Sequence, residues 1–232
     1  MSSRADDWRQ SIKSAKSPDK WPRALEKARV LQNELAAEVL VEDRCPAINC
    51  VAGIDVGFEN GGKIARAAAV VLSFPDLTVL DSAIGKSPAR FPYILGYLSF
   101  RELPVVLDAL SKLVTVPNII VCDGQGIAHP RRLGIASHLG VLLNIATVGV
   151  GKTRLIGTYQ EPKNHKGAWS PLSDKGEAIG AVLRTRRNVK PIYVSVGHKI
   201  SLPSAIDIVL RCCTRYKIPE TTRHAHRLAS SK

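Results

Sequence analysis

Short apolar runs and amphipathic stretches alternate along this chain of 232 residues. The apolar runs are rich in valine, isoleucine and other strand formers, and their length is typical of buried or half-buried β-strands. These runs cover residues 49–56, 66–73, 77–84, 119–122, 146–150, 178–184 and 191–196. Elsewhere, apolar residues that recur three and four positions apart predict amphipathic helices. The predicted helices cover residues 19–40, 97–113, 132–142 and 205–213.

The order of these elements predicts the fold class. Phe74-Pro75-Asp76 is a tight connection of the kind that joins antiparallel strands, and residues 58–63 join the first two strands in the same way. Three antiparallel strands therefore open the domain, and helices and strands alternate after them. We predict an α/β fold in which helices flank both faces of a mixed central sheet.

The remaining segments are polar. Residues 1–20 carry charges of both signs and several serines, so we predict a flexible N-terminal arm. A single domain is then expected over residues 21–232. Within it, residues 158–174 are predicted to form a long surface loop and residues 214–232 a basic tail.

Charge and cysteine content narrow the range of functions. A formal net charge of +13 favours a polyanionic partner, although a basic protein without a nucleic-acid role is an alternative. The five cysteines form no Cys-x-x-Cys pair, which speaks against a zinc site or a disulfide framework. We therefore expect reduced thiols and an intracellular, cytoplasmic protein, or a nuclear or nucleolar one in a eukaryote. No apolar run is long enough to predict a membrane span.

The sharpest local feature begins at Ile119. Four apolar residues predict a buried strand that leads directly into Asp123, and the turn Gly124-Gln125-Gly126 follows. Glycine permits a sharp bend and lets a ligand approach the backbone. A carboxylate at the end of a buried strand needs a cationic partner. The basic residues His129 and Arg131 come next, and they suit a phosphate group.

Asp55 interrupts the apolar run 49–56 much as Asp123 ends its own run. If these two strands are neighbours, their carboxylates meet in a pocket of low dielectric, where a divalent cation relieves their repulsion. Oxygen ligands without thiolates favour Mg²⁺ or Mn²⁺ over Zn²⁺. The alternative is that each aspartate only caps the end of a strand or helix.

Three further residues are candidates, each with a simpler alternative. Glu102 lies in a predicted helix, where a glutamate is most often a solvated surface residue. His226 lies in the basic tail, where a histidine is often without a catalytic role. Tyr93 follows Pro92, and a ring presented by a stiff segment can enter a base stack or pack on the surface.

Lys152 has two interpretations. Gly151-Lys152-Thr153 is similar to the end of a P-loop, which would make the protein a nucleotide triphosphatase. The full motif needs a glycine where Ala146 stands, and the acidic strand precedes the loop instead of following it. At a strand end, Lys152 can instead neutralise a backbone phosphate.

Taken together, these motifs resemble those of the endonuclease V family. The matching segments are Ala52-Gly53-Ile54-Asp55-Val56-Gly57-Phe58, Pro92-Tyr93-Ile94, Phe100-Arg101-Glu102, Asp123-Gly124-Gln125-Gly126-Ile127-Ala128-His129-Pro130-Arg131, Gly149-Val150-Gly151-Lys152 and Thr222-Arg223-His224-Ala225-His226. The resemblance spans about residues 25–226. It implies an RNase H-like fold and Mg²⁺-dependent cleavage, with Mn²⁺ as a substitute, of the second phosphodiester bond 3′ to deoxyinosine or inosine. The implied products carry 3′-hydroxyl and 5′-phosphate ends, and the implied role is DNA repair or turnover of inosine-containing RNA.

The resemblance also implies roles for single residues. Asp55, Glu102 and Asp123 match the metal-binding carboxylates. Lys152 matches a lysine beside the reacting phosphate, and His226 matches the terminal histidine of the catalytic set. The expected nucleic-acid contacts are the wedge residue Tyr93, the pocket walls at Gly96 and Leu98, and the side chains of His129, Arg131 and Lys152.

Two positions depart from the family pattern. Gln125 stands where bacterial members usually have histidine, and Leu95 replaces the second proline of the wedge segment. An inosine-binding protein with weak or no catalysis is therefore the alternative to an active enzyme. The expected partner is inosine-containing DNA or RNA, with the preference between them open, and a monomer without membrane contact is expected.

Overall fold

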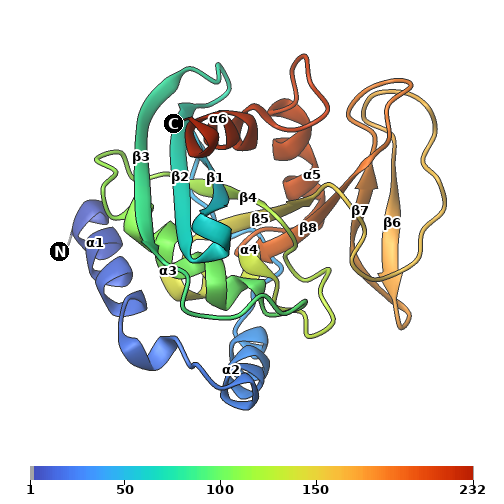
Figure 1. Cartoon of the computed structure of the whole chain (residues 1–232). Helices are drawn as coiled ribbons and strands as arrows, with labels where there is room; N and C mark the ends of the chain where they lie inside the picture. The colour runs from blue at the N-terminus through green and yellow to red at the C-terminus, as the bar shows by residue number, and fades with distance from the viewer. Residues whose placement is uncertain (1–2, 232) are drawn as a thin grey trace.

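The computed structural model describes residues 3–231, which form eight strands and six α-helices around one central sheet (Figure 1). The strands are β1 (Cys50–Glu59), β2 (Ile64–Ser73), β3 (Val79–Pro88), β4 (Ile119–Asp123), β5 (Ala146–Gly151), β6 (Trp169–Asp174), β7 (Glu177–Leu183) and β8 (Ile192–His198). The helices are α1 (Arg4–Ala15), α2 (Leu25–Ala37), α3 (Leu98–Leu110), α4 (Ile135–Leu143), α5 (Leu202–Arg211) and α6 (Glu220–Ser230).

The sheet is mixed, as predicted. Its strands follow the order β3-β2-β1-β4-β5-β8-β7-β6. β1, β4 and β5 are parallel, whereas the other neighbouring strands are antiparallel. Both connections expected in the opening meander, at residues 58–63 and at Phe74-Pro75-Asp76, join antiparallel partners. Because β1, β4 and β5 are parallel, their carboxyl ends open at the same edge of the sheet.

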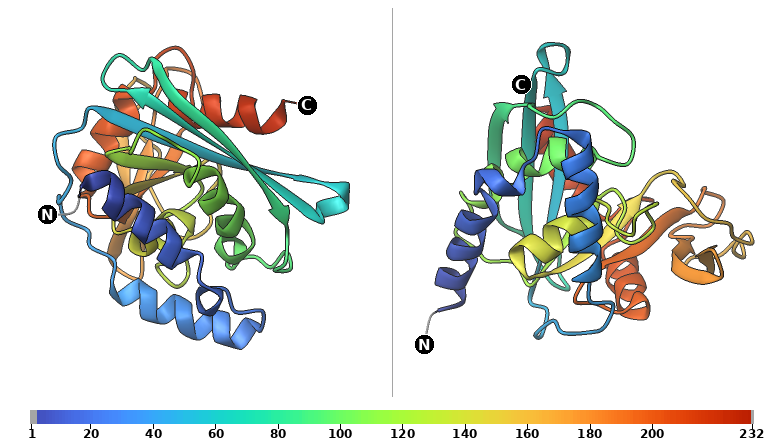
Figure 2. Two further views of the ribbon diagram at one scale, coloured as in Figure 1. Left: turned by 90° about the vertical axis from the view of Figure 1, so that its left-hand side faces the viewer. Right: turned by 90° about the horizontal axis from the view of Figure 1, so that it is seen from below.

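Side chains of β1 alternate between two hydrophobic cores. Ala52 and Ile54 pack with residues of α1, α3 and α4, while Val51 on the other face packs with residues of α5 and α6. In Figure 2, α6 lies across the sheet from α1 and α3. Helices therefore flank both faces of the sheet, as the alternation of apolar positions requires.

The N-terminal segment is more ordered than the sequence predicts. Of the arm expected over residues 1–20, the first two residues lie outside the described part, and α1 forms most of the rest. Trp8, Ile12 and Ala15 are buried in the core shared with α3 and α4. The expectation of a loosely held arm is wrong for α1, because these three residues form a narrow apolar stripe on an otherwise polar helix.

The connection from α1 to α2 is compact. Pro18–Lys20 form a single 3₁₀ turn, η1, and the indole Nε1 of Trp21 donates to the carbonyl of Ala15 at 2.8 Å. The helix predicted from residue 19 therefore begins only at Leu25, since the chain folds back on itself first.

Two other segments contain elements that the sequence analysis missed. The loop predicted over residues 158–174 includes β6, which pairs with β7. A proline such as Pro171 argues against a central strand because it has no N–H group to donate. β6 is at the edge of the sheet, where that missing donor costs no hydrogen bond to a neighbouring strand. The tail predicted over residues 214–232 contains α6, whose buried side chains are small or hydroxylated.

A missing side chain explains how α6 lies so close to the sheet. A Cβ atom at Gly53 of β1 would come within 2.2 Å of the Thr221 carbonyl, so only glycine fits there.

All five cysteines are free thiols, and four of them are buried. In the chain from residue 3 to 231, no helix combines the length and apolar character needed to cross a membrane.

Candidate active site

Asp55 and Asp123 lie next to each other on one face of the sheet. β1 and β4 are parallel neighbours whose register pairs Ile54 with Cys122, so each aspartate is the next residue along its strand. Alternation turns both side chains to the face that α6 covers. Their side chains are 12% and 19% exposed, respectively. Two largely shielded carboxylates at neighbouring positions of β1 and β4 form one anionic centre, whereas two separate caps would not lie together.

A cationic or proton-bearing group is paired with each aspartate. Lys152, just beyond the end of β5, donates from Nζ to Oδ2 of Asp123. On α6, Nδ1 of His226 donates to Oδ2 of Asp55 at 3.0 Å. Because α6 packs closely against Gly53, His226 lies within hydrogen-bonding distance of Asp55 on β1. The structure thus gathers four of the predicted residues at one sheet edge.

Glu102 approaches the same site from α3. Together with Asp55, Asp123, Lys152 and His226 it lines a cavity of about 390 Å³. Burial raises the pKa of Glu102 to about 7, and the negative charges of Asp123 and Asp55 add to that shift. The pKa of Asp123 is also raised, chiefly by burial, although Lys152 opposes the shift. Glu102 is therefore part of the acidic centre and not a solvated surface residue.

The acidic centre has the donor chemistry of a hard divalent cation. Its three carboxylates supply only oxygen ligands, and the pKa values of Glu102 and Asp123 are raised by burial and by the neighbouring negative charge, which bound positive charge would offset. Within residues 3–231, no group of three or more His, Cys, Asp or Glu side chains already has the arrangement of an ion site. Lys152 neutralises part of the negative charge by its ion pair with Asp123, and His226 is hydrogen-bonded to Asp55.

Glu102 makes stability depend on pH in the metal-free protein. Its pKa is about 7 in the folded chain, against an ordinary value of 4.5, so the folded state binds more protons between these values. Stability therefore falls as the pH rises through this window, by at most about 3 kcal/mol. We expect melting curves recorded with a chelator to show a smaller loss of Tm from pH 5 to pH 8 in Glu102→Gln than in the natural protein. An equal pH dependence in both proteins would contradict the buried, repelled state of Glu102.

The segment that contains Tyr93, the predicted wedge residue, lies beside a second cavity. Tyr93 is 71% exposed and Leu95 is 68% exposed, so both side chains project from the loop that precedes α3. Gly96 and Leu98 line a cavity of about 260 Å³ that also touches Glu102 and Asp123 of the acidic centre. The two cavities therefore adjoin, and Leu95, two residues after the exposed Tyr93, lines the second.

His129 and Arg131 lie under this loop instead of facing solvent. His129 is buried, and its Nε2 donates to the Gly96 carbonyl at 3.1 Å. Burial lowers the pKa of His129 to about 4, and Arg131 adds to that shift, so the ring is neutral. The guanidinium of Arg131 donates to the same carbonyl at 2.7 Å and stacks on Tyr97. In this arrangement both residues hold the loop and do not extend toward a phosphate.

Gln32 of α2 is a third donor to this carbonyl, and the sequence analysis did not single it out. It is fully buried, and its Nε2 donates to Gly96 O at 3.0 Å while its Oε1 accepts from Arg131 Nε at 2.6 Å. Gly96 has a φ of 81°, which favours glycine. The sequence held one signal for this role: Gln32 lies on the apolar stripe of a predicted helix, four residues after Ala28, where a polar side chain is expected to be buried.

The glycine turn after Asp123 serves packing. A Cβ atom at Gly126 would lie 1.9 Å from the Val196 carbonyl of β8, so the backbones touch there. Between the glycines, Gln125 donates from Nε2 to the Thr153 carbonyl at 3.1 Å, and its buried Oε1 has no hydrogen-bond partner within the described chain. The turn thus brings β8 close to the strand end that carries Asp123. Gln125 links the turn to the segment that carries Lys152.

The P-loop interpretation of Lys152 is wrong. A P-loop is followed by a helix whose first turn cradles the phosphates. The chain after β5 has no helix until α5, so Lys152 has no such cradle. Its ammonium group is instead paired with Asp123.

Comparisons with known proteins identify the family and the fold. The family model described as Endonuclease V matches residues 33–227. A Nostoc sp. protein named endonuclease V is 60% identical over 216 residues, which cover 93% of this chain and 98% of the relative. The crystal structure of endonuclease V from Streptomyces avermitilis superposes with a TM-score of 0.86 at 43% identity, covering 90% of this chain and 92% of that one. A Ciona intestinalis endonuclease V, solved with a 23mer DNA containing an inosine followed by a ribo-adenosine, gives a TM-score of 0.75 at 30% identity and covers 88% and 95% of the two chains. The fold is therefore the RNase H-like fold that was expected.

Proposed function

Because the chain belongs to the endonuclease V family, we propose that this nuclease cuts the second phosphodiester bond 3′ to deoxyinosine or inosine in a Mg²⁺-dependent reaction. One observation carries the proposal. Carboxylates from β1, β4 and α3 meet Lys152 and His226 in one cavity, at the edge where the parallel strands end. Such a cavity combines an anionic centre with positive charge for a phosphodiester.

The acidic centre would hold the cation. Asp55, Glu102 and Asp123 are its ligands in this proposal, and Mn²⁺ would substitute for Mg²⁺. When bound, the ion supplies Lewis-acid stabilisation of the negative charge that gathers on the scissile phosphate. The shared charge of the three carboxylates fixes where that ion binds.

The other residues act on the phosphate and on the attacking water. Lys152, whose side chain is 47% exposed, can turn its ammonium group from Asp123 to a non-bridging phosphate oxygen. His226 is 63% exposed and is oriented by Asp55, so its ring can orient an attacking water or accept its proton. Both residues are already within the cavity, so no large movement is required.

The second cavity would receive the extruded base. Its walls at Gly96 and Leu98 offer backbone groups to a base edge, and the exposed Tyr93 ring would fill the gap left in the stack. Hypoxanthine lacks the exocyclic amino groups of adenine and guanine, so a narrow pocket can accept it and reject them. The three donors on the Gly96 carbonyl would fix this wall from beneath.

Replacing Gln32 tests whether this wall sets base recognition. Gln32→Leu removes one donor to Gly96 and leaves Arg131 Nε unpaired, which should destabilise the protein by about 1–3 kcal/mol. We also expect the preference for an inosine strand over a matched guanosine strand to fall several-fold. The measurement is kcat/KM for both strands, with Gln10→Leu as the matched substitution on the exposed side of α1. Lower stability with unchanged preference would limit Gln32 to a structural role.

The proposed reaction is tested with matched strands. DNA and RNA oligonucleotides, each with and without a single inosine, are incubated with the protein and Mg²⁺, Mn²⁺ or a chelator. We expect cutting of inosine strands only, with either ion, at the second bond on the 3′ side and with a 5′-phosphate on the downstream product. Salt-sensitive binding without any cutting would instead favour the silent inosine-binding alternative.

A further inference from the structure

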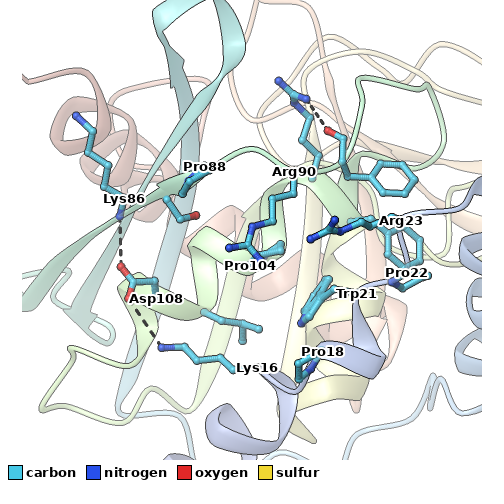
Figure 3. Close-up of a pocket in the computed structure, with 15 residues that line it drawn as sticks. Lys16, Pro18, Trp21, Pro22, Arg23, Lys86, Pro88, Arg90, Pro104 and Asp108 are labelled. Atoms are coloured by element: carbon cyan, nitrogen blue, oxygen red, sulfur yellow. Dashed lines mark hydrogen bonds and ion pairs between the residues drawn. The ribbon is translucent and has the colours of Figure 1, made fainter.

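A third cleft lies on the far side of α3 from the acidic centre. It has a volume of about 470 Å³ and is walled by η1 and the segment between η1 and α2 on one side and by the end of β3 and α3 on the other (Figure 3). Arg101, Pro104 and Asp108 of α3 line this cleft, whereas Glu102 lines the acidic cavity. The helix therefore separates the two sites, and nothing in the proposed reaction uses the cleft.

The cleft is strongly basic. Five basic residues line it and Asp108 is the one acidic residue among them. Asp108 is already neutralised, because Lys112 donates to its Oδ2 at 2.8 Å and the Lys86 amide does so at 3.3 Å. These contacts lower the pKa of Asp108 against the opposing effect of its burial, so it remains ionised and paired. The cleft thus has a surplus of positive charge.

Two arginines carry most of that surplus. Arg23 lines the cleft from the segment before α2 and Arg90 from the segment after β3, and both side chains project into it (Figure 3). Within residues 3–231, neither guanidinium has a hydrogen-bond acceptor, an acidic partner or an aromatic ring beneath it. Arg101 differs, since it donates to the carbonyls of Phe91 and Gly62. Two unpaired guanidinium groups directed at one space are suited to a phosphate group between them.

The floor of the cleft is apolar and rigid. Trp21 is stacked on His138 with ring centroids 5.7 Å apart, and its Nε1 is bound to Ala15. Phe91 and Phe100 are buried beside it, with their centroids 5.5 Å apart. A sugar or base attached to the phosphate would therefore meet a flat hydrophobic surface.

The position of Arg90 connects the cleft to the wedge. Arg90 is three residues before Tyr93, so their Cα atoms are at most about 11 Å apart. That distance equals roughly three nucleotides of a stacked strand at 3.4 Å each. In the proposed function the reacting phosphate lies 3′ to the inosine. The strand on the 5′ side would therefore leave the base pocket in the direction opposite to the acidic centre, past the loop that carries Arg90 and Tyr93.

We propose that this cleft binds a backbone phosphate of the nucleic-acid strand on the 5′ side of the inosine, between Arg23 and Arg90. The strand direction rests on the proposed function, while the affinity for a phosphodiester rests on the cleft alone. The segment that carries Arg23 precedes residue 33, where the family model begins to match. The alignment with the Nostoc sp. relative covers 93% of the chain and includes this segment, so a subsite there would lie outside the residues matched by the family model but within those shared with that relative.

Strand length and charge together test the proposal. Binding is measured by fluorescence anisotropy in a chelator, so that no cleavage occurs, with inosine strands that carry either eight nucleotides or one nucleotide 5′ to the inosine. For Arg23→Ala/Arg90→Ala, we expect the Kd of the long strand to rise roughly tenfold and that of the short strand to change less than about twofold. The slope of log K against log salt for the long strand should become shallower by about 0.7, because each phosphate that the protein neutralises on a single strand contributes about 0.7 to that slope.

A control pair removes the same charge elsewhere. Arg186→Ala/Arg187→Ala changes two exposed arginines between β7 and β8 and should leave both Kd values within about twofold. An equal rise in Kd on both strands, or no rise on either, would overturn the proposal. Binding of AMP that disappears in the Arg23/Arg90 variant without any difference between the strands would assign the cleft to free nucleotides and overturn it as well. Because the assay needs no cleavage, a failure of the proposed reaction would be seen separately, as absence of cutting by the natural protein.

Discussion

Replacing Asp123 with asparagine is expected to lower the single-turnover rate on an inosine strand by about a thousandfold or more. Asparagine keeps the shape of the side chain and removes the charge that pairs with Lys152 and adjoins Asp55. The acidic centre then loses both a ligand and the field that would hold a divalent ion. Asp55→Asn should have a similar effect, because Asp55 is the neighbouring position on β1.

The matched control is Asp207→Asn on the exposed side of α5. Asp207 forms a surface pair with Arg211 at 3.4 Å, and such pairs contribute little. Rates are compared under saturating enzyme, after circular dichroism has shown that all three variants are folded like the natural protein. Cutting by Asp123→Asn at more than about a tenth of the natural rate would show that the reaction does not depend on the Asp123 carboxylate.

Lys152→Ala is expected to lower the same rate by about a hundredfold to a thousandfold, the usual effect of removing one preorganised charge from a developing oxyanion. Its ammonium group is the cation paired with Asp123, and it stands free of any P-loop helix. Substrate affinity should fall much less than the rate, because many other basic residues contribute to binding.

Lys27→Ala, on the exposed face of α2, is the control for this substitution. Single-turnover rates and strand Kd values are measured for both variants. A Lys152→Ala protein that loses affinity but keeps its rate would show that Lys152 only attracts the strand.

Much of the fold follows from local pattern. The central strands are short apolar runs that fit few structures other than a buried strand. β1, β2, β4 and β5 were therefore predictable from composition and length. The two aspartates stood out because each breaks such a run. Their meeting was not predictable from pattern alone, since it depends on which strands pair and in which register.

The misses have a common cause in weak apolar signals. α1 buries only three residues, and α6 buries small side chains against Gly53, so neither shows a broad hydrophobic stripe. The role of Gln32 depends on a carbonyl that lies 64 residues further along the chain. Long-range polar contacts of this kind leave no periodic trace in a sequence.

His129 and Arg131 illustrate the same limit. Basic residues after a strand end suggest phosphate binding, but here both are used to hold the Gly96 carbonyl. Unpaired cations lie elsewhere, among them Arg23 and Arg90, which no motif marked. Charge in a sequence predicts a polyanionic partner, while the structure decides which charges are free to meet it.

Titration of Mn²⁺ into the chelator-treated protein, followed by calorimetry, tests most directly whether the acidic side chains on neighbouring strands form one ion site. If they do, the natural protein binds the ion saturably, and binding is lost in both Asp55→Asn and Asp123→Asn while Asp207→Asn retains it. Undiminished binding by either of the first two variants would contradict a shared site at Asp55 and Asp123.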